Sequence, residues 1–214
     1  ADQLLRDAVP VLGLRQAMQR ALVRRRYSPL ALDFVDSRVV DASYTAGSVG
    51  EQAMCEVIVH AWSERYWKTD RVLELFCGLG NLTLPVASKV ERVGGLDYDE
   101  KLVRRAKDNA LFNHKDNVEF IRADLTEAPV GEWPTSERFT KLLLDPPRSG
   151  ALEILSTIVP TLAPERIVYV SCNPETLARD AATLTARFGY RLEAIQVVDM
   201  FAHTGHVETI ALFV

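Results

Sequence analysis

Residues 71–97 read RVLELFCGLGNLTLPVASKVERVGGLD, and this stretch decides the fold class. An apolar run at 72–77 ends in glycines, a helical pattern follows to about residue 89, and a second apolar run occupies 92–97. A strand that leads through a glycine turn into a helix and then into another strand is typical of a parallel β-α-β unit. The stretch therefore predicts an α/β fold.

The same alternation continues towards the C-terminus. Further strands are expected at 118–124, 141–145 and 166–172, and helices at 98–113, 151–159 and 174–189. Two more strands lie within 192–201 and 206–214, and the link between them is too short for a helix, so they must be antiparallel. A mostly parallel seven-stranded sheet with a C-terminal antiparallel hairpin resembles the Rossmann-like methyltransferase fold.

Length and composition set the domain organisation. With 214 residues, the chain can form one domain and an appendage. We expect an appendage of helix and short strands at 1–66 and a catalytic domain at 67–214. The net charge of −4 argues against binding nucleic acid by bulk charge alone. Two basic clusters could each be a phosphate-binding patch or a solvated helix face: Arg20, Arg24, Arg25 and Arg26, and Arg104 with Arg105.

Cysteine usage and hydropathy exclude several classes of protein. The three cysteines, Cys55, Cys77 and Cys172, are far apart, which fits a reducing cytoplasm better than a disulfide framework. No apolar run approaches the roughly 20 residues that cross a bilayer. We therefore expect a cytoplasmic protein, most simply a monomer, without a membrane partner.

Four acidic residues lie at the carboxyl ends of predicted strands or just inside them: Glu74, Asp97, Asp124 and Asp145. Ligands of open α/β sheets bind at these ends. Asp97 could accept hydrogen bonds from ribose hydroxyls, and Asp124 could meet an adenine amino group. Either aspartate alone could equally be a helix N-cap. Their joint placement favours a cofactor site.

The glycine turn between the first strand and its helix narrows the choice of cofactor. Gly78 and Gly80 allow the backbone to turn tightly and approach a ligand. Thr83 interrupts the Gly-x-Gly-x-x-Gly fingerprint of dinucleotide sites, and no phosphate-binding loop occurs. A cofactor without a pyrophosphate is favoured, and cationic S-adenosylmethionine fits among carboxylates. The expected cofactor-binding residues are Glu74, Phe76, Gly78, Gly80, Asn81, Asp97, Asp124 and Asp145.

Three further segments carry candidate chemistry: DPPRSG at 145–150, SCNP at 171–174 and DMFAHTGHVE at 199–208. Two prolines after an acid make a rigid loop with few hydrogen-bond donors, which can hold a flat base. His203 and His206 could suggest a metal pair. They lack a third ligand at proper spacing, so we expect structural histidines and no metal.

Four stretches together resemble the RNA 5-methyluridine methyltransferases: VLELFCGLGNLTLPVA, LLLDPPRSG, VYVSCNPETLARD and DMFAHTGHVETIALF. The resemblance covers about residues 70–214, and the branch that acts on 23S ribosomal RNA looks most similar. It implies S-adenosylmethionine-dependent methylation of uridine carbon 5 in RNA, with ribosomal RNA favoured over transfer RNA.

The resemblance also implies residue roles. Carbon 5 of uracil is a poor nucleophile until a thiolate adds to carbon 6, and a base must later remove the carbon 5 proton. Cys172 would be the nucleophile, Glu208 the base, and Asp145 a contact of the uracil edge or the thiol. Pro146, Arg148 and Asn173 would contact the substrate. We expect the site to favour the thiolate, and Arg148 could either be a source of that field or bind a phosphate of the RNA.

Two alternatives stay open at this point. The family usually carries a Phe-x-Gln-x-Asn stretch, which residues 42–52 lack apart from Gln52. The chain could therefore be a degenerate paralogue or truncated domain that binds cofactor or RNA without efficient methylation. Other RNA base methyltransferases fit less well. Cytosine-5 enzymes usually have a second cysteine, and amino-group enzymes an aromatic residue, where this chain has Arg148.

Overall fold

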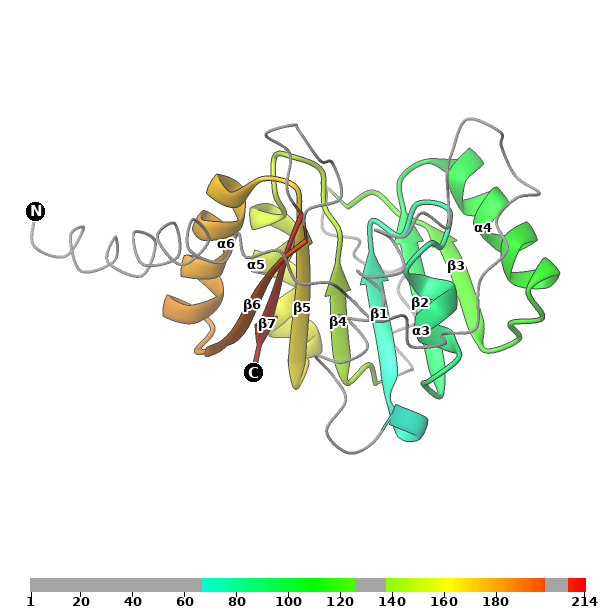
Figure 1. The fold of residues 1–214 in the computed structure, drawn as a ribbon, viewed down its shortest axis with the longest axis horizontal. Coiled ribbons are helices and arrows are strands. Elements are labelled where there is room, and N and C mark those ends of the chain that lie inside the picture. Colours follow the sequence, from blue (N-terminus) through cyan, green and yellow to red (C-terminus); the bar gives the residue numbers. More distant parts are fainter. Residues whose placement is uncertain (1–66, 126–137, 199–207) are drawn as a thin grey trace, which may run out of the picture.

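The computed structural model describes residues 67–125, 138–198 and 208–214, and these form a seven-stranded sheet of order β3-β2-β1-β4-β5-β7-β6 (Figure 1). The strands are β1 (Arg71–Leu75), β2 (Arg92–Asp97), β3 (Val118–Arg122), β4 (Lys141–Leu144), β5 (Arg166–Ser171), β6 (Leu192–Val198) and β7 (Glu208–Phe213). The helices are η1 (Trp67–Thr69), α3 (Thr83–Ala87), α4 (Glu100–Phe112), α5 (Leu152–Leu162) and α6 (Pro174–Ala186).

The predicted fold class is confirmed. Strands β1 to β5 pair in parallel, and β7 is antiparallel to both β5 and β6. The last strand therefore inserts between β5 and β6. This insertion places the start of β7 beside the end of β5.

Several elements end earlier or later than predicted. The first strand stops at Leu75, because Phe76 takes a left-handed backbone conformation with φ of 64°. Helix α3 has only five residues, whereas the prediction ran to about residue 89. Helix α5 continues through Pro160 to Leu162 instead of stopping at residue 159. Asp145 follows β4 directly, and Asp124 lies two residues beyond the end of β3.

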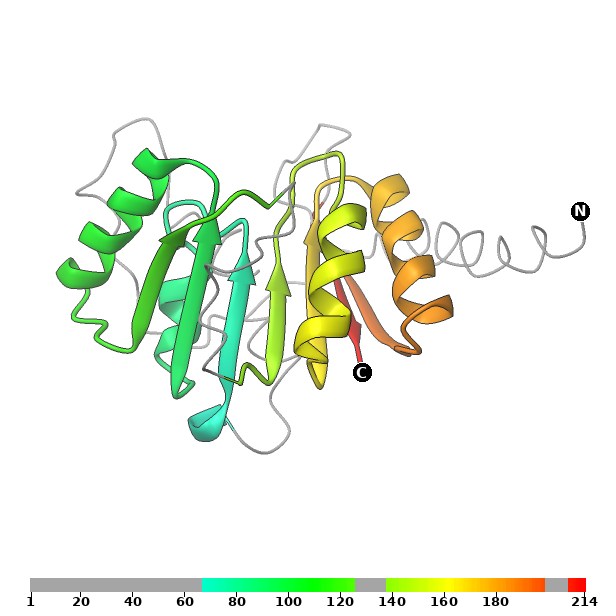
Figure 2. The same cartoon turned by 180° about the vertical axis from the view of Figure 1, so that it is seen from behind.

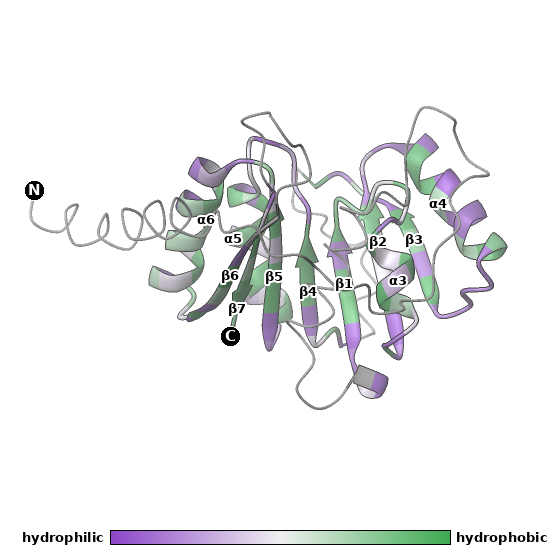
Figure 3. Ribbon diagram, viewed as in Figure 1, coloured by the Kyte–Doolittle hydropathy of each residue, from purple (hydrophilic) through white to green (hydrophobic). Residues whose placement is uncertain are grey.

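Helices cover both faces of the sheet. Figure 1 shows α3 in front of the sheet, and Figure 2, seen from behind, shows α5 in front of it. Leu84 of α3 joins residues of α4 and Phe120 of β3 in one cluster, so these helices share a face. Residues of α5 and α6 join a larger cluster on the other face. The central strands are accordingly apolar along most of their length (Figure 3).

Phe120 sets the shape of the sheet beneath the glycine turn. A Cβ atom on Gly95 of β2 would lie 2.7 Å from Cδ1 of the Phe120 ring, and one on Gly80 would lie 2.9 Å from its Cζ. Both positions must therefore be glycine, because the ring fills the space that a side chain would need. The ring thus joins β3, β2 and the turn after β1.

None of the helices in the three described ranges is long and apolar enough to span a membrane. The predicted appendage, with Cys55 and the basic cluster at 20–26, lies outside the described residues. The domain boundary at 66/67 therefore stays a prediction.

Gly95→Ala tests the role of the Phe120 ring. The added methyl group must displace the ring, and overpacking of this kind costs about 1–3 kcal/mol. The free energy of unfolding in urea should fall by that amount. Phe120→Leu, which removes the obstructing ring atoms, is the matched partner. In the Phe120→Leu background the alanine should cost clearly less, and an equal cost in both backgrounds would show that the ring is not the constraint.

Candidate active site

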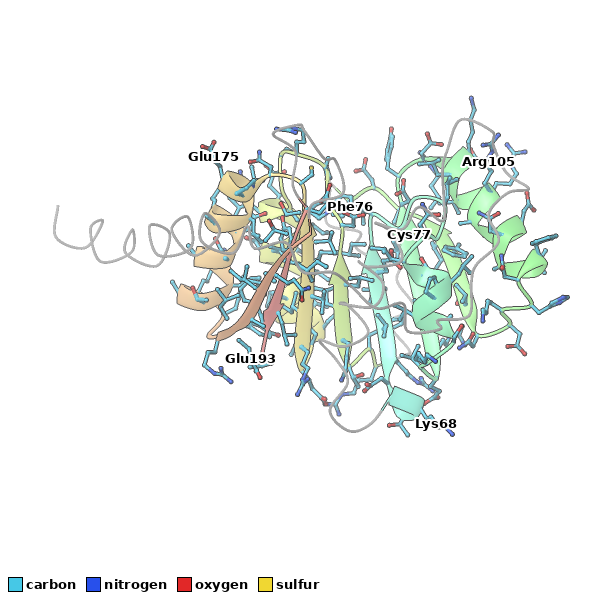
Figure 4. The ribbon with its side chains drawn as sticks, in the orientation of Figure 1. Lys68, Phe76, Cys77, Arg105, Glu175 and Glu193 are labelled. Carbon is cyan, nitrogen blue, oxygen red and sulfur yellow. The ribbon has the colours of Figure 1, made fainter. Side chains whose placement is uncertain are left out.

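The predicted site residues gather at one edge of the sheet. Figure 4 shows Phe76 and Cys77, just after β1, at the upper edge, with Glu175 at the start of α6 on the same side. Lys68 and Glu193 mark the opposite edge. The carboxyl ends of β1, β2, β4 and β5 thus meet at one edge, as expected for an open parallel sheet.

The glycine turn is held in place by backbone and side-chain contacts. The backbone amide of Cys77 donates to the Leu96 carbonyl at 3.0 Å, which ties the turn to β2. Asn109, buried in α4, donates through Nδ2 to the Leu79 carbonyl at 3.0 Å. Gly78 and Gly80 have φ values of 53° and 86°, so the turn uses the left-handed conformations that glycine permits.

Asp97 points back into this turn. Its Oδ2 accepts the backbone amide of Gly78 at 2.9 Å, and its Oδ1 accepts the amide of Asp99 at 2.9 Å. The N-cap of α4 is Asp99, whose Oδ1 accepts the amide of Lys101 at 2.7 Å. The helix-cap interpretation of Asp97 is therefore wrong. Each carboxylate oxygen can accept a further bond, so Asp97 keeps its capacity for a ligand hydroxyl.

Glu74 is a buried carboxyl group with one oxygen atom that lacks a hydrogen-bond partner among the described residues. It is 1% exposed, and its Oε2 accepts no hydrogen bond among the described residues. Burial raises the pKa of Glu74 from 4.5 to about 8, Thr83 acts in the opposite direction, and the charges of Asp145 and Asp97 raise it further. A buried carboxyl surrounded by acids is unfavourable unless a cation or donor binds beside it. Glu74 is therefore suited to a cationic ligand.

Strand register brings Cys172 and Glu208 together. Ser171 at the end of β5 pairs with Thr209 of β7 in antiparallel register. Cys172 follows Ser171 and Glu208 precedes Thr209, so the two become cross-strand neighbours. Their charges interact, as do those of Cys172 with Arg148 and Asp145. Cys172, Glu208, Arg148 and Asp145 form the second half of the candidate site, and the residues around the glycine turn form the first half.

The pKa values of the two carboxyl groups in this second half of the site are raised. Burial, followed by the charge of Glu208, raises the pKa of Asp145 from 3.8 to about 7. Burial also raises the pKa of Glu208, which Arg148 partly offsets. Among the described residues, Arg148 offsets the raised pKa of Glu208, and no cation is found to do the same for Asp145, so this part of the site is short of positive charge.

The expectation of a favoured thiolate is wrong for the site without ligands. Burial first, and then the charge of Glu208, raises the pKa of Cys172. Arg148 lowers it, as expected, but does not prevail. Negative neighbours and partial burial both disfavour a second anion.

The remaining predicted residues are placed as follows. Asp124 is exposed beyond β3, and the preceding Ala123 donates its amide to the Asp97 carbonyl at 2.9 Å. Pro146 is buried. Asn173 caps α6 through Oδ1 and donates through Nδ2 to the Arg148 carbonyl at 3.0 Å. The loop with His203 and His206, and Gln52, lie outside the described residues.

Sequence analysis missed the residues that hold the proline loop against α6. Asp180 is fully buried in an amphipathic helix, where a charged residue is rarely found without a specific partner. Thr176 and Arg179 lie one turn before it or beside it. The sequence signal that could have identified them is the set of polar residues that interrupts the apolar side of this helix.

Comparison with known proteins identifies the family of the chain. A family model described as tRNA (uracil-5-)-methyltransferase matches residues 32–214. The chain belongs to this family. A curated relative from Alkalilimnicola ehrlichii, 23S rRNA (uracil(1939)-C(5))-methyltransferase RlmD, is 57% identical over 144 residues, covering 67% of this chain and 32% of the relative. The protein of that name from Xanthomonas oryzae pv. oryzae is 53% identical, covering 74% of this chain and 36% of the relative.

Solved structures extend the comparison. The Pyrococcus abyssi tRNA (uracil-54, C5)-methyltransferase, in complex with S-adenosyl-L-homocysteine, is 32% identical with a TM-score of 0.66, covering 78% of this chain and 39% of that chain. TrmN from Thermus thermophilus, 22% identical with a TM-score of 0.59 over 75% of this chain and 47% of that one, shares the fold. This uracil-5-methyltransferase family member spans about a third of the length of its curated relatives.

Glu74→Gln tests the buried carboxyl. The raised pKa means that between pH 4.5 and about 8 the folded chain keeps a proton that the unfolded chain has released, so rising pH costs stability. At about 1.4 kcal/mol per pH unit, the variant should gain roughly 3 kcal/mol over the wild type between pH 5 and pH 8. Urea unfolding at both pH values measures this gain.

Glu74→Asp is the matched control for this measurement. It keeps a carboxyl group at the buried position, so the dependence on pH should persist. If Glu74→Gln and the wild type show the same change in unfolding free energy between pH 5 and pH 8, Glu74 is ionised in the folded chain and the account of its environment is wrong.

Proposed function

We propose that this chain is the catalytic domain of an enzyme that methylates carbon 5 of uridine in RNA, using S-adenosylmethionine. The observation that carries the proposal is the position of Cys172 and Glu208 beside the Ser171–Thr209 pair of β5 and β7, next to carboxyl groups whose pKa values are raised. Ribosomal RNA is favoured over transfer RNA, because the curated relatives at 57% and 53% identity are named for 23S rRNA.

The first half of the site fits a cationic cofactor. S-adenosylmethionine supplies an electrophilic methyl group when it is bound. Glu74, buried and unpartnered at Oε2, faces the charges of Asp145 and Asp97. Asp97 offers oxygen atoms beside the glycine turn for the ribose hydroxyls, and Asp124 follows the neighbouring strand for the adenine. Phe76, Gly78, Gly80 and Asn81 complete this half of the proposed site.

The second half supplies the chemistry on the base. The Cys172 sulfur forms a bond to carbon 6 of uracil, and the ring electrons move to give an enolate whose carbon 5 is nucleophilic. S-adenosylmethionine, when bound, would supply the methyl group to carbon 5 as its methyl–sulfur bond breaks and neutral S-adenosylhomocysteine leaves. Glu208 then removes the proton from carbon 5, the carbon–sulfur bond breaks, and the thiolate leaves. The target base must leave its stack to reach this edge of the sheet.

The raised pKa values describe how the site is prepared for this sequence. Asp145, with a pKa of about 7, can either donate a hydrogen bond to a uracil carbonyl or accept one from the ring nitrogen. Glu208 and Asp145 both raise the pKa of Cys172, so a cation among the acids lowers the thiol pKa. Thiolate formation is thereby coupled to cofactor binding. Arg148 adds to the same effect from the proline loop, and Pro146 and Asn173 are the other residues proposed to contact the base.

Methyl transfer to unmodified total RNA, followed by nucleoside analysis, tests the proposed function. The purified protein with S-adenosylmethionine should produce 5-methyluridine, and 23S ribosomal RNA should be a better substrate than transfer RNA. Production of 5-methylcytidine or a methylated amino group would contradict the proposal. Binding of S-adenosylmethionine without any methyl transfer would identify a degenerate paralogue instead.

Cys172→Ala tests the covalent step. The variant should lose methyl transfer but bind S-adenosylmethionine with unchanged affinity in calorimetry, because Cys172 belongs to the base half of the site. RNA containing 5-fluorouridine should form a stable adduct with the wild type, since fluorine cannot leave as a proton does. Cys77→Ala, at a thiol that is 4% exposed, is the matched control and should retain the adduct. An adduct mapped to a residue other than Cys172 would contradict the proposed mechanism.

A further inference from the structure

The loop after β4, residues 145–151, is held by polar side chains of α6. Asn173 donates through Nδ2 to the carbonyl of Arg148 at 3.0 Å, and the Thr176 hydroxyl lies 3.2 Å from the same oxygen and 3.1 Å from the Asn173 carbonyl, so its hydrogen is shared between them. Arg179 donates through Nη2 to the next carbonyl, that of Ser149, at 2.8 Å. Two consecutive carbonyl groups of the loop are therefore fixed by one helix.

Asp180 is the buried centre of this network. Its side chain is 0% exposed, and its Oδ2 accepts the backbone amide of Ala151 at 2.6 Å and the hydroxyl of Tyr169 at 2.7 Å. Its Oδ1 accepts Nε of Arg179 at 2.8 Å. A buried carboxylate with three charge-assisted contacts has a strongly preferred geometry. Asp180 thus fixes the far end of the loop.

Gly150 shows how closely the loop lies against these groups. Its φ is +80°, and a Cβ atom there would lie 2.6 Å from both Arg179 Nη2 and Asp180 Oδ2. A side chain at this position would separate the loop from α6. The loop is therefore seated directly on the hydrogen-bonding network.

The spacing of residues along α6 explains why the side chains that contact the loop can act together. Asn173, Thr176 and Arg179 are three residues apart, and Asp180 follows, so all four lie along one side of α6. Cys172 immediately precedes Asn173. The same short segment therefore carries the nucleophile and the residues that hold the loop opposite it.

We propose that Thr176, Arg179 and Asp180 are positioning residues that fix the 145–151 loop, and with it the Arg148 guanidinium, relative to Cys172. The proposal rests on the proposed function, because it assigns these residues a part in that reaction. None of the three needs to touch substrate or cofactor. They act through the loop carbonyls of Arg148 and Ser149 and the amide of Ala151.

The functional consequence follows from the charges around the thiol. Cys172 is faced by Glu208 and Asp145, which disfavour its ionisation, and by Arg148, which favours it. Arg148 also favours ionisation of Glu208. If the loop moves away, the thiol loses the favourable charge of Arg148, whereas the unfavourable charge of Glu208, which lies on β7, stays in place. If the contacts between α6 and the loop only stabilised the fold, removing them would lower the free energy of unfolding without changing the ionisation of Cys172.

Thr176→Val and Arg179→Gln, alone and together, test the proposal. The matched controls lie on α6 or at its C-terminal cap, and their side chains form hydrogen bonds to residues outside the loop. They are Thr183→Val, whose hydroxyl donates to the Arg179 carbonyl, and Arg187→Gln, whose guanidinium donates to the Ser156 hydroxyl. The first readout is the rate of Cys172 alkylation by iodoacetamide against pH, without cofactor or RNA, followed by mass spectrometry of the Cys172 peptide. The second is single-turnover methyl transfer.

We expect the alkylation midpoint of Cys172 to move to higher pH in the Thr176 and Arg179 variants and to stay in place in both controls. Because small misplacements of catalytic groups can cost about 100-fold in rate, kcat should fall by roughly 10- to 100-fold with little change in KM for S-adenosylmethionine. Arg179→Lys keeps a charge beside Asp180 but not the planar fork, so it should recover stability more than kcat.

An unchanged alkylation midpoint and unchanged kcat, together with a lower unfolding free energy, would overturn the positioning role. If the Arg179 variants do not fold, Thr176→Val, which removes a single hydroxyl group, gives the deciding measurement. The alkylation readout needs no methyl transfer. A wild type without methyl transfer but with the expected midpoint shifts in its variants would reject the proposed reaction and keep the loop-positioning role.

Discussion

The antiparallel register between β5 and β7 is the constraint on which the candidate site depends. Ser171 pairs with Thr209, and this single pairing determines which residues stand opposite each other where β5 ends and β7 begins. A shift of one residue would turn the side chains of β7 to the other face of the sheet. Buried residues of β7, from Thr209 to Phe213, hold the register against both neighbours. Packing in the core therefore sets the distance between a thiol and a carboxyl at the edge.

Among the described residues, a shortage of positive charge is common to both halves of the site. Glu74, Asp145 and Glu208 all have raised pKa values, and burial is the largest cause in each case. Asp145 belongs to both halves, because its charge acts on Glu74 and on Cys172. Such sites are unfavourable for stability and suited to ligands that bring the missing charge. The arrangement favours a cationic methyl donor over a neutral or anionic cofactor.

The sequence predicted the fold well because its apolar runs and glycine turns are local signals. The parallel alternation and the antiparallel last pair are confirmed. The ends of the strands were predicted less accurately. Phe76 ends β1 with a left-handed backbone conformation, which is not expected for a phenylalanine. Asp97 could not be separated from a helix cap by spacing alone. Only the structure shows that Asp99 takes the capping role and leaves Asp97 facing the glycine turn.

The candidate site was less predictable, because its partners are distant in the sequence. The link between Cys172 and Glu208 came from a resemblance, and the β5–β7 pairing gives it a physical reason. The thiol environment was misjudged because one arginine was considered without the acids opposite it. The role of α6 was missed because its evidence is tertiary: Asp180 is intelligible only beside Tyr169 and Ala151. Buried polar groups are found where hydrogen-bond partners satisfy them. The polar residues of α6 therefore indicate a loop packed against the helix, and that loop cannot be inferred from the sequence of the helix alone.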